Sequence, residues 1–359
     1  MPALSAPGSV TGEDILSDVI LVVSILSALG AAWMIMGFIV GHLSCANVKS
    51  LRDNSLIFGW ISSLSRHCEH FDISLGISDF VMALNFMLST SMNLSGRKIW
   101  SESLQDFCSF NGFMTQVFVI QTDYWILNIA ICTYSILAEH KRFFAWLQDH
   151  PFVVGLWPWV LSIIWAVLGL VLAGYQNIGA WCWFASDRTR LLVNFVPRWI
   201  IIFVIIALYL RLSYNLRQIR RQLESSEEDT TIILSGCRID HHSNSEQTIV
   251  QSGSCGHASN SKTEIGNALR HRRQSSKLKK VSIRMMMYPI VYMLIWTIPT
   301  AIRIYQGTTG KSTSLAVNCI DKSCIAIQGV ADAIIYGLNE RTWNEWRKHI
   351  FLQERRLRS

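Results

Sequence analysis

The sequence predicts an all-α membrane protein that folds as a bundle of seven transmembrane helices. The apolar residues of the 359-residue chain gather in blocks of roughly 20, the length that a helix needs to cross about 30 Å of hydrocarbon. In lipid the backbone must satisfy its own hydrogen bonds, so each block is expected to be a helix. Several of the 14 tryptophans lie near block ends, as in an interfacial aromatic belt. The blocks lie at about 18–41, 72–92, 112–137, 152–174, 194–212, 285–305 and 318–338.

Lysine and arginine set the orientation of these spans. Residues 1–17 contain neither, so we expect an outer amino terminus and no cleavable signal peptide of the usual kind. Seven spans then place residues 42–71, 138–151, 213–284 and 339–359 inside, and these segments hold most of the 32 basic residues. The net charge of +7 therefore indicates topology and attraction to anionic lipid, and not a nucleic-acid partner. We expect a multi-pass protein of the plasma membrane.

The first two spans flank an unusual segment. Residues 42–71 are expected to form a long inner loop, because the apolar run 56–61 within it is too short to span a membrane. The second span carries Asp79 well inside the hydrocarbon. At its outer end, Asn93-Leu94-Ser95 is a sequon for N-glycosylation.

The third span is the one that the rest of the chain surrounds. It carries Gln116, Asp123 and Asn128, and a carboxylate at the centre of a span costs about 2.5–3.5 kcal/mol on insertion scales. Such a residue usually faces the interior of a bundle and has a function there. Cys108 opens this span on the outer side and Cys182 lies in the next outer loop, where an oxidising environment favours a disulfide between them over two buried thiols.

Two further features of the outer and inner faces have open alternatives. Cys319 and Cys324 at the start of the last span form either a second disulfide or two thiols. The inner loop 213–284 is rich in Ser, Thr, Asn and charge, so it is expected to be largely disordered. Ser275 follows two arginines and is a candidate phosphorylation site for a kinase; the alternative is a solvated basic flank.

The last two spans contain a predicted hinge and a predicted amphipathic helix. Pro299 removes a backbone hydrogen bond close to Trp296, which favours a kink about which the inner end of the helix can swing. The alternative is an ordinary proline kink without switching. In the tail 339–359, Trp343, Trp346 and Ile350 recur at three and four residues, the pattern of a short helix that lies on the inner membrane surface.

Buried polar residues point to a receptor or to a transporter. Asp79, Asp123 and Asp332 lie on three spans, and such a network serves either as a bistable signalling element or as an ion relay. The only lysine of the last span, Lys322, lies at its outer end, which argues against a retinal pump, and the spans show no internal duplication of the transporter kind. No zinc-ligand pair, nucleotide loop or nucleophile motif is found, so we expect no catalytic residue, metal or cofactor.

Four separated motifs carry a resemblance to a known family. They are the run from Phe107 to Arg142, the step Ser78-Asp79-Phe80, the YPxxYxxxWxxP pattern from Tyr288 to Pro299, and DAIIYGLNE from Asp332 to Glu340. Together they resemble the cyclic-AMP-receptor-like G-protein-coupled receptors of slime moulds and filamentous fungi, in particular the fungal branch. The likeness covers nearly all the membrane part and fails in the first and third inner loops.

The resemblance implies a receptor that senses an extracellular small molecule, activates a heterotrimeric G protein and feeds cyclic-AMP or nutrient signalling. Membrane lipid and a kinase or arrestin-like regulator are further expected partners. The alternatives are a seven-helix transporter or sensor without a G protein, and a receptor-derived scaffold with altered signalling. Glu139-His140-Lys141-Arg142 stands where rhodopsin-like receptors have Asp-Arg-Tyr, so an ionic lock of their type is not expected.

Three groups of residues follow as candidates. Arg198 and Arg303 fall in outer turns, where they either face inward and suit an anionic ligand or extend to lipid headgroups. The candidate ligand contacts are Gln116, Asp123, Arg198, Trp296 and Arg303. The candidate switching core is Asp79, Asn128, Pro299, Asp332 and Tyr336, next to Asp123 and Trp296. The candidate G-protein side is Glu139, Lys141, Arg142, Arg217, Arg220 and Arg221.

Overall fold

The protein is mostly helical. A computed structural model of the chain describes residues 10–48, 56–99, 101–138, 145–146, 149–184, 186–236 and 285–338. The long helices are α1 (Val10–Val48), α2 (Leu56–Leu94), α3 (Gln105–Leu137), α5 (Pro151–Leu172), α7 (Val196–Gly236) and α9 (Met287–Thr309), followed by α10 (Leu315–Ala326) and α11 (Gln328–Gly337). Short elements are the 3-10 turn η2 (Glu102–Leu104), the strands β1 (Gln176–Asn177) and β2 (Cys182–Trp183), α6 (Asp187–Arg190) and the π-helical turn η3 (Leu191–Phe195).

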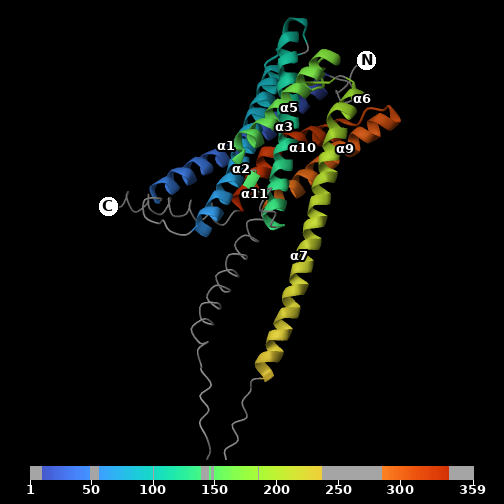
Figure 1. Cartoon of the computed structure of the whole chain (residues 1–359). Helices are drawn as coiled ribbons and strands as arrows, with labels where there is room; N and C mark the ends of the chain where they lie inside the picture. The colour runs from blue at the N-terminus through green and yellow to red at the C-terminus, as the bar shows by residue number, and fades with distance from the viewer. Residues whose placement is uncertain are drawn as a thin grey trace, which may run out of the picture.

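The described helices pack into one bundle, and seven units of it are assigned to the membrane. Figure 1 shows their arrangement. Among the described residues, six helices are long and apolar enough to span a membrane. The seventh unit is α10 followed by α11, which a turn at Ile327 separates. Broken helices are tolerated in membranes where protein covers the break, and Gln328 and Gly329 beside the turn are buried.

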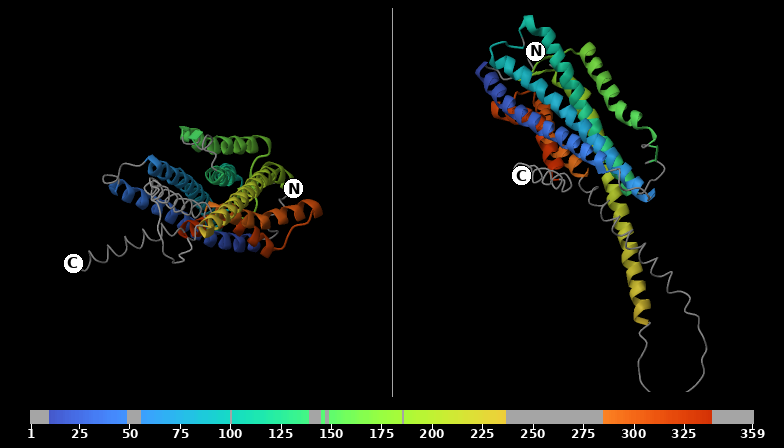
Figure 2. Two further views of the ribbon diagram at one scale, coloured as in Figure 1. Left: turned by 60° about the horizontal axis from the view of Figure 1, so that its bottom comes forward. Right: turned by 90° about the vertical axis from the view of Figure 1, so that its left-hand side faces the viewer.

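Helix α3 lies at the centre of the bundle. Seen almost end-on in the left view of Figure 2, it lies among α2, α5 and α7, all of which it contacts. In its most apolar stretch 83% of the residues are buried, compared with 28% in α5 and in α7. The polar residues that the sequence places on α3 therefore face protein and not lipid.

The helices differ from the predicted spans mainly on the inner side. Helix α2 begins at Leu56, so residues 56–61, expected in a loop, form its first turns. Helix α7 continues to Gly236 and extends well beyond the bundle (Figures 1 and 2), so residues 213–236 of the expected disordered loop are helical. This stretch has no proline, its only glycine is its last residue, and it is rich in Leu, Arg, Gln and Glu, which favour helix in water as well as in lipid. The rest of that loop and the tail 339–359 lie outside the described residues.

A small hairpin closes the outer end of the bundle, which we define as the end that carries the disulfide. Strands β1 and β2 pair antiparallel, with Asn177 opposite Cys182. Cys182 is bonded to Cys108 of α3 with an S–S distance of 1.99 Å, as expected. The second disulfide considered above is not formed, because Cys319 and Cys324 are free thiols. Both belong to α10, and residues five apart in a helix point about 140° away from each other.

Asn93 anchors this hairpin and is not an accessible sequon. Its side chain is buried, and its Nδ2 atom donates to the carbonyls of Gly179 at 3.5 Å and Ala180 at 3.4 Å. Its Oδ1 atom accepts a hydrogen bond from the amide of Ile99 at 3.2 Å. A glycan on Asn93 would have to displace these contacts, so the sequon has a structural role.

Candidate functional site

A buried ion pair between Asp123 of α3 and Arg198 of α7 forms the centre of the site. The Nη2 atom of Arg198 lies 3.0 Å from Oδ2 of Asp123, and its Nε atom donates to both carboxylate oxygens at 3.1 Å. Tyr292 of α9 donates its hydroxyl to Asp123 and accepts from Nε of Arg198 at 3.0 Å. The carboxylate of Asp123 therefore connects α3 to both α7 and α9.

The indole ring of Trp296 lies against one face of the Arg198 guanidinium. The Cζ atom of Arg198 lies 3.2 Å from the centroid of Trp296 and 5.7 Å from that of Phe195. Arg198 is fully buried, so it faces the interior and does not extend to lipid headgroups. The π-helical turn η3 ends at Phe195, directly before α7, and such turns are frequent at functional sites because they reorient the residues that follow.

A second layer connects this ion pair to the outer hairpin. Gln116 lies seven residues before Asp123, about two helical turns outward on the same face of α3. Its Oε1 atom accepts a hydrogen bond from Nε1 of Trp183 at 2.6 Å and one from Nδ2 of Asn194 at 3.5 Å. Asn194 precedes Arg198 by one helical turn, so the two residues line one side of the site.

Four buried polar atoms in these two layers have no hydrogen-bond partner among the described residues. They are Nε2 of Gln116, Oδ1 of Asn194, Nη1 of Arg198 and Nε1 of Trp296. Buried polar groups are nearly always paired, and leaving one unpaired costs about 1–3 kcal/mol. These three donors and one acceptor, from α3, η3, α7 and α9, provide the chemistry to hold a small polar ligand.

Arg303, the remaining candidate ligand contact, lies in a separate cluster. It is two turns outward from Trp296 on α9, where its Nη2 atom pairs with Asp321 of α10 and its Nη1 atom donates to Gln306 at 2.6 Å. Arg303 is buried and faces inward, as Arg198 does. Each of the two arginines is paired with a carboxylate, Arg198 with Asp123 and Arg303 with Asp321.

The residues of the candidate switching core do not form a single cluster. Asp79 of α2 and Asp332 of α11 lie against each other in the interior, and Asp332 also contacts Gln328. Two adjacent buried carboxyl groups repel when both are ionised, so this pair favours a shared proton. Ser78, next to Asp79, donates to Gln121 of α3 at 3.0 Å and links the pair to the central helix.

Asn128 lies apart from this carboxyl pair and contacts α5. Its Nδ2 atom donates to the carbonyl of Val154 at 3.2 Å, and its Oδ1 atom accepts from Nε1 of Trp157 at 3.2 Å, so it ties α3 to α5. Tyr336 packs edge-on against Trp33 of α1, with ring centroids 5.8 Å apart. Pro299 is buried inside α9, one turn after Trp296.

The candidate G-protein side is only partly described. Arg217 is exposed on the part of α7 that follows the apolar span. Arg220 and Arg221 follow on the same helix. Glu139, Lys141, Arg142 and Ser275 lie outside the described residues.

The sequence reasoning missed three residues of these clusters: Asn194, Tyr292 and Asp321. Tyr292 stands in the YPxxYxxxWxxP pattern four residues before Trp296, so helical spacing alone could have placed it beside that ring. Asp321 stands near the outer end of a predicted span, where a charge is ordinarily solvated, and only packing shows that it is buried.

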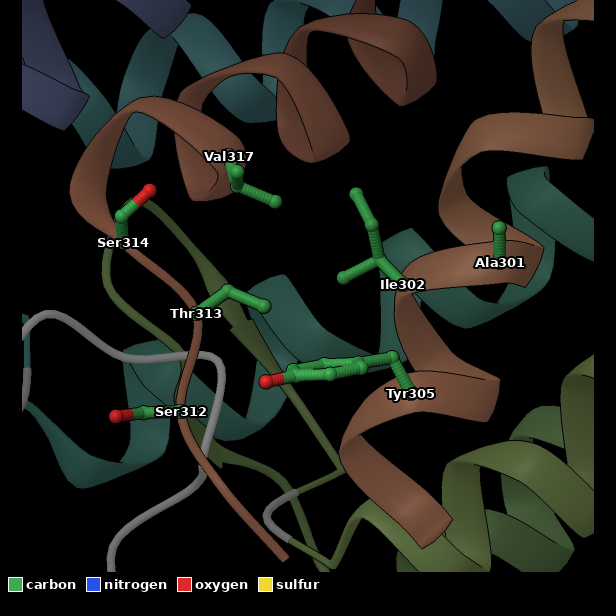
Figure 3. Close-up of a pocket in the computed structure, with 7 residues that line it drawn as sticks. All are labelled: Ala301, Ile302, Tyr305, Ser312, Thr313, Ser314 and Val317. Carbon is green, nitrogen blue, oxygen red and sulfur yellow. The ribbon is translucent and has the colours of Figure 1, made fainter. Parts of the chain in front are cut away.

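A pocket opens at the outer end of the bundle between α9 and α10 (Figure 3). It measures about 420 Å³ and has an apolar floor with a hydroxyl-bearing rim. Its lining residues are Ala301, Ile302, Tyr305, Ser312, Thr313, Ser314 and Val317. The Oγ1 atom of Thr313 accepts from Gln306 at 3.4 Å and donates to Asn318 at 2.8 Å, which joins the rim to the cluster around Arg303.

Comparison with known proteins gives one family over most of the chain. The family model described as G protein-coupled glucose receptor regulating Gpa2 matches residues 45–224, and its C-terminal counterpart matches residues 271–345. Two receptors of Arthrobotrys oligospora are similar along nearly their whole length. Ascaroside receptor GPR2 is 37% identical over 97% of this chain and 93% of its own. Ascaroside receptor GPR3 is 29% identical over 96% and 89%.

The structure of squid rhodopsin has the same fold. It superposes with a TM-score of 0.61 over 94% of this chain and 85% of its own, at 13% sequence identity. An identity this low shows a common seven-helix arrangement and carries no information on the ligand.

Proposed function

Because the chain belongs to the family of G protein-coupled glucose receptors regulating Gpa2, we propose that a small polar ligand bound beside the Asp123–Arg198 pair controls its G protein. Receptors of this class sense an extracellular molecule and signal through a heterotrimeric G protein, and they are not enzymes. The proposal adds the site and the mechanism by which its residues act.

The observation that carries the proposal is the group of unpaired atoms on Gln116, Asn194, Arg198 and Trp296. Hydroxyl groups both accept and donate hydrogen bonds, so a hydroxyl-rich molecule would match three donors and one acceptor. The family description names glucose and the relatives' names specify ascarosides, so these two ligand classes are the first to test.

Activation follows from competition for Arg198. A ligand that accepts a hydrogen bond from its Nη1 atom draws the guanidinium away from Asp123 and from the face of Trp296. Since Tyr292 and Trp296 lie on α9 just before Pro299, a change in their contacts is transmitted to the kink, and the inner part of α9 moves. The Asp79–Asp332 pair of α2 and α11 is the second bistable element of this pathway, and the basic residues from Arg217 onward flank the G protein.

The proposal extends to the membrane in which the receptor resides, the pathway that it feeds and the proteins that regulate it. The receptor resides in the plasma membrane, feeds cyclic-AMP or nutrient signalling, and contacts anionic lipid through its basic inner face. A kinase that recognises the arginines before Ser275, or an arrestin-like protein, regulates it.

Nucleotide exchange on a purified heterotrimeric G protein tests the ligand site. We expect the full-length receptor to stimulate exchange when glucose or an ascaroside is added. The Gln116→Leu variant should require roughly 5–13 times more ligand, because one hydrogen bond in a buried site contributes on the order of 1–1.5 kcal/mol. Gln105→Leu is the matched control, since Gln105 is exposed at the start of α3.

Two results would contradict the proposal. One is an unchanged ligand response in Gln116→Leu. The other is solute or ion flux through the reconstituted protein with no nucleotide exchange, which would favour a transporter.

A further inference from the structure

The outer pocket between α9 and α10 lies on the side of α9 that faces away from the candidate ligand site. Its residues Ala301 and Tyr305 come five and nine positions after Trp296, which turns them about 140° and 180° away from that residue around the helix. Both are exposed, whereas Trp296 is buried. The proposed ligand site and switch do not use this pocket.

The pocket lies at the level of the outer leaflet of the membrane. The apolar span of α9 ends at Thr309, and Ala301 lies eight residues before it, about 12 Å along the helix. Apolar side chains beside the pocket on α9 and α10 are exposed, among them Ile298, Ile304 and Ile320. In a membrane these side chains face lipid, so a molecule dissolved in the outer leaflet can reach the pocket from the side.

The lining of the pocket divides into an apolar floor and a hydroxyl-bearing rim. The floor consists of Ala301, Ile302 and Val317, and Figure 3 shows the last two pointing toward each other. In the same view the ring of Tyr305 lies across the pocket, with its hydroxyl toward the loop that carries the rest of the rim. That loop contributes Ser312, Thr313 and Ser314. None of the seven described residues that line the pocket carries a charge.

We infer that this pocket binds a membrane sterol. A sterol is a rigid apolar ring system with one hydroxyl group at its end. The rings match the floor, which is the part that lies deeper in the membrane, and the hydroxyl reaches the rim, where side-chain hydroxyls both donate and accept hydrogen bonds. The volume of about 420 Å³ falls within the range of about 300–1,000 Å³ that is typical of small-molecule sites.

Charge and flexibility argue against the other lipids of a bilayer. The phosphate of a phospholipid is ordinarily bound by arginine or lysine, and Lys311 of the adjoining loop is exposed and is not part of the lining. Flexible acyl chains lose conformational entropy when a site orders them, whereas fused rings are already rigid. A neutral, rigid molecule with a single hydroxyl is therefore the occupant that the lining favours.

A sterol in this pocket braces the outer part of α9 against α10. Pro299 lies two residues before Ala301, so the bound sterol adjoins the kink of α9. The inference goes beyond the proposed function, because sterol binding requires neither a ligand beside Arg198 nor a G protein.

Photolabelling of the full-length receptor in a phosphatidylcholine bilayer tests sterol binding. The probe is a sterol with a free hydroxyl and a diazirine on its ring system, and mass spectrometry maps the labelled residues. We expect the label to concentrate in residues 301–317 and unlabelled cholesterol to displace it. The same hydrocarbon without the hydroxyl should displace the probe roughly 2–13 times less effectively, because it forms no hydrogen bond at the rim.

Two variants test the floor and the rim separately. Ala301→Phe fills the floor and should lower the label in residues 301–317 at least about fivefold, since overpacking costs roughly 1–3 kcal/mol. Its matched control is Ala207→Phe, because Ala207 is an exposed alanine in the span of α7. Tyr305→Phe removes one rim hydroxyl and keeps the ring, so the advantage of cholesterol over the hydrocarbon should shrink. Tyr214→Phe, at an exposed tyrosine of α7, should preserve that advantage.

Three results would overturn the inference: label spread evenly over the lipid-facing helices, undiminished label in Ala301→Phe, or equal displacement by cholesterol and the hydrocarbon in the wild type. Displacement of the probe by butyl glucoside added to the water would instead assign the pocket to a soluble ligand. Preferential labelling of the pocket by a photoreactive phosphatidylcholine would assign it to phospholipid, and either outcome removes the sterol.

Discussion

Asp123 and Arg198 show how one pair of buried residues can tie two helices of the bundle together. Both are buried, and each is costly in the membrane interior without the other. Their position also shows the limit of sequence reasoning at this scale. Asp123 was identifiable as a functional residue because a carboxylate inside a span is rare. Arg198 was a candidate as well, but its pairing with Asp123 was not predicted, because the sequence does not tell which face of α7 meets α3.

A double-mutant cycle measures the coupling between these two residues. Asp123→Asn leaves the buried guanidinium without its counter-charge, so we expect a loss of about 3–5 kcal/mol in stability, and Arg198→Gln should cost a similar amount. The double variant Asp123→Asn/Arg198→Gln should lose clearly less than the sum, since no uncompensated charge remains. Tm measurements in detergent follow the cycle.

The control for this cycle is the pair Lys98–Asp14 at the outer surface, whose side chains are only partly buried. Asp14→Asn should change stability by no more than about 1 kcal/mol, as is usual for ion pairs at a protein surface. Strictly additive losses in the double variant would mean that Asp123 and Arg198 are not coupled.

At the level of elements, hydrophobic blocks predicted the number and order of the spans but not where the helices end. Hydropathy reports contact with lipid, whereas helices such as α2 and α7 continue into water as long as their residues favour helix. The break at Ile327 was also not predicted. Its reason is close packing of α11 against α1, where Gly329 donates its amide to the Oγ atom of Ser27 at 3.1 Å.

This packing predicts a selective effect of adding one methyl group. A Cβ atom on Gly329 would lie 2.6 Å from Oγ and 2.9 Å from the carbonyl oxygen of Ser27, and 3.3 Å from Cβ of Asp79. Because backbone must move, Gly329→Ala should lower stability by about 1–3 kcal/mol. Gly307→Ala in α9 is the matched control, since nothing lies within 4 Å of its added Cβ, and it should be neutral or slightly stabilising. Equal Tm values for the two variants would contradict the packing described for α1 and α11.

For the whole molecule, the sequence predicted the class of protein and the outer disulfide, and it placed Gln116, Asp123, Arg198 and Trp296 in one candidate site. The sequence did not show that Arg303 lies apart from the other candidate ligand contacts, or that Asn128 lies apart from the Asp79–Asp332 pair. Each of the two residues contacts a neighbour that is known only once the helices are packed. Arg303 meets Asp321 of α10, and Asn128 meets Trp157 of α5. Long-range pairs of this kind depend on helix rotation, which composition and spacing do not determine.

The central claim is that ligand acts on the G protein through the Asp123–Arg198 pair. Ligand-stimulated nucleotide exchange by the double variant Asp123→Asn/Arg198→Gln, compared with the wild type at equal amounts of folded receptor, tests it most directly. The account predicts that the double variant shows no difference in exchange between samples with and without ligand, whereas the wild type responds. A ligand response in the double variant equal to that of the wild type would contradict it.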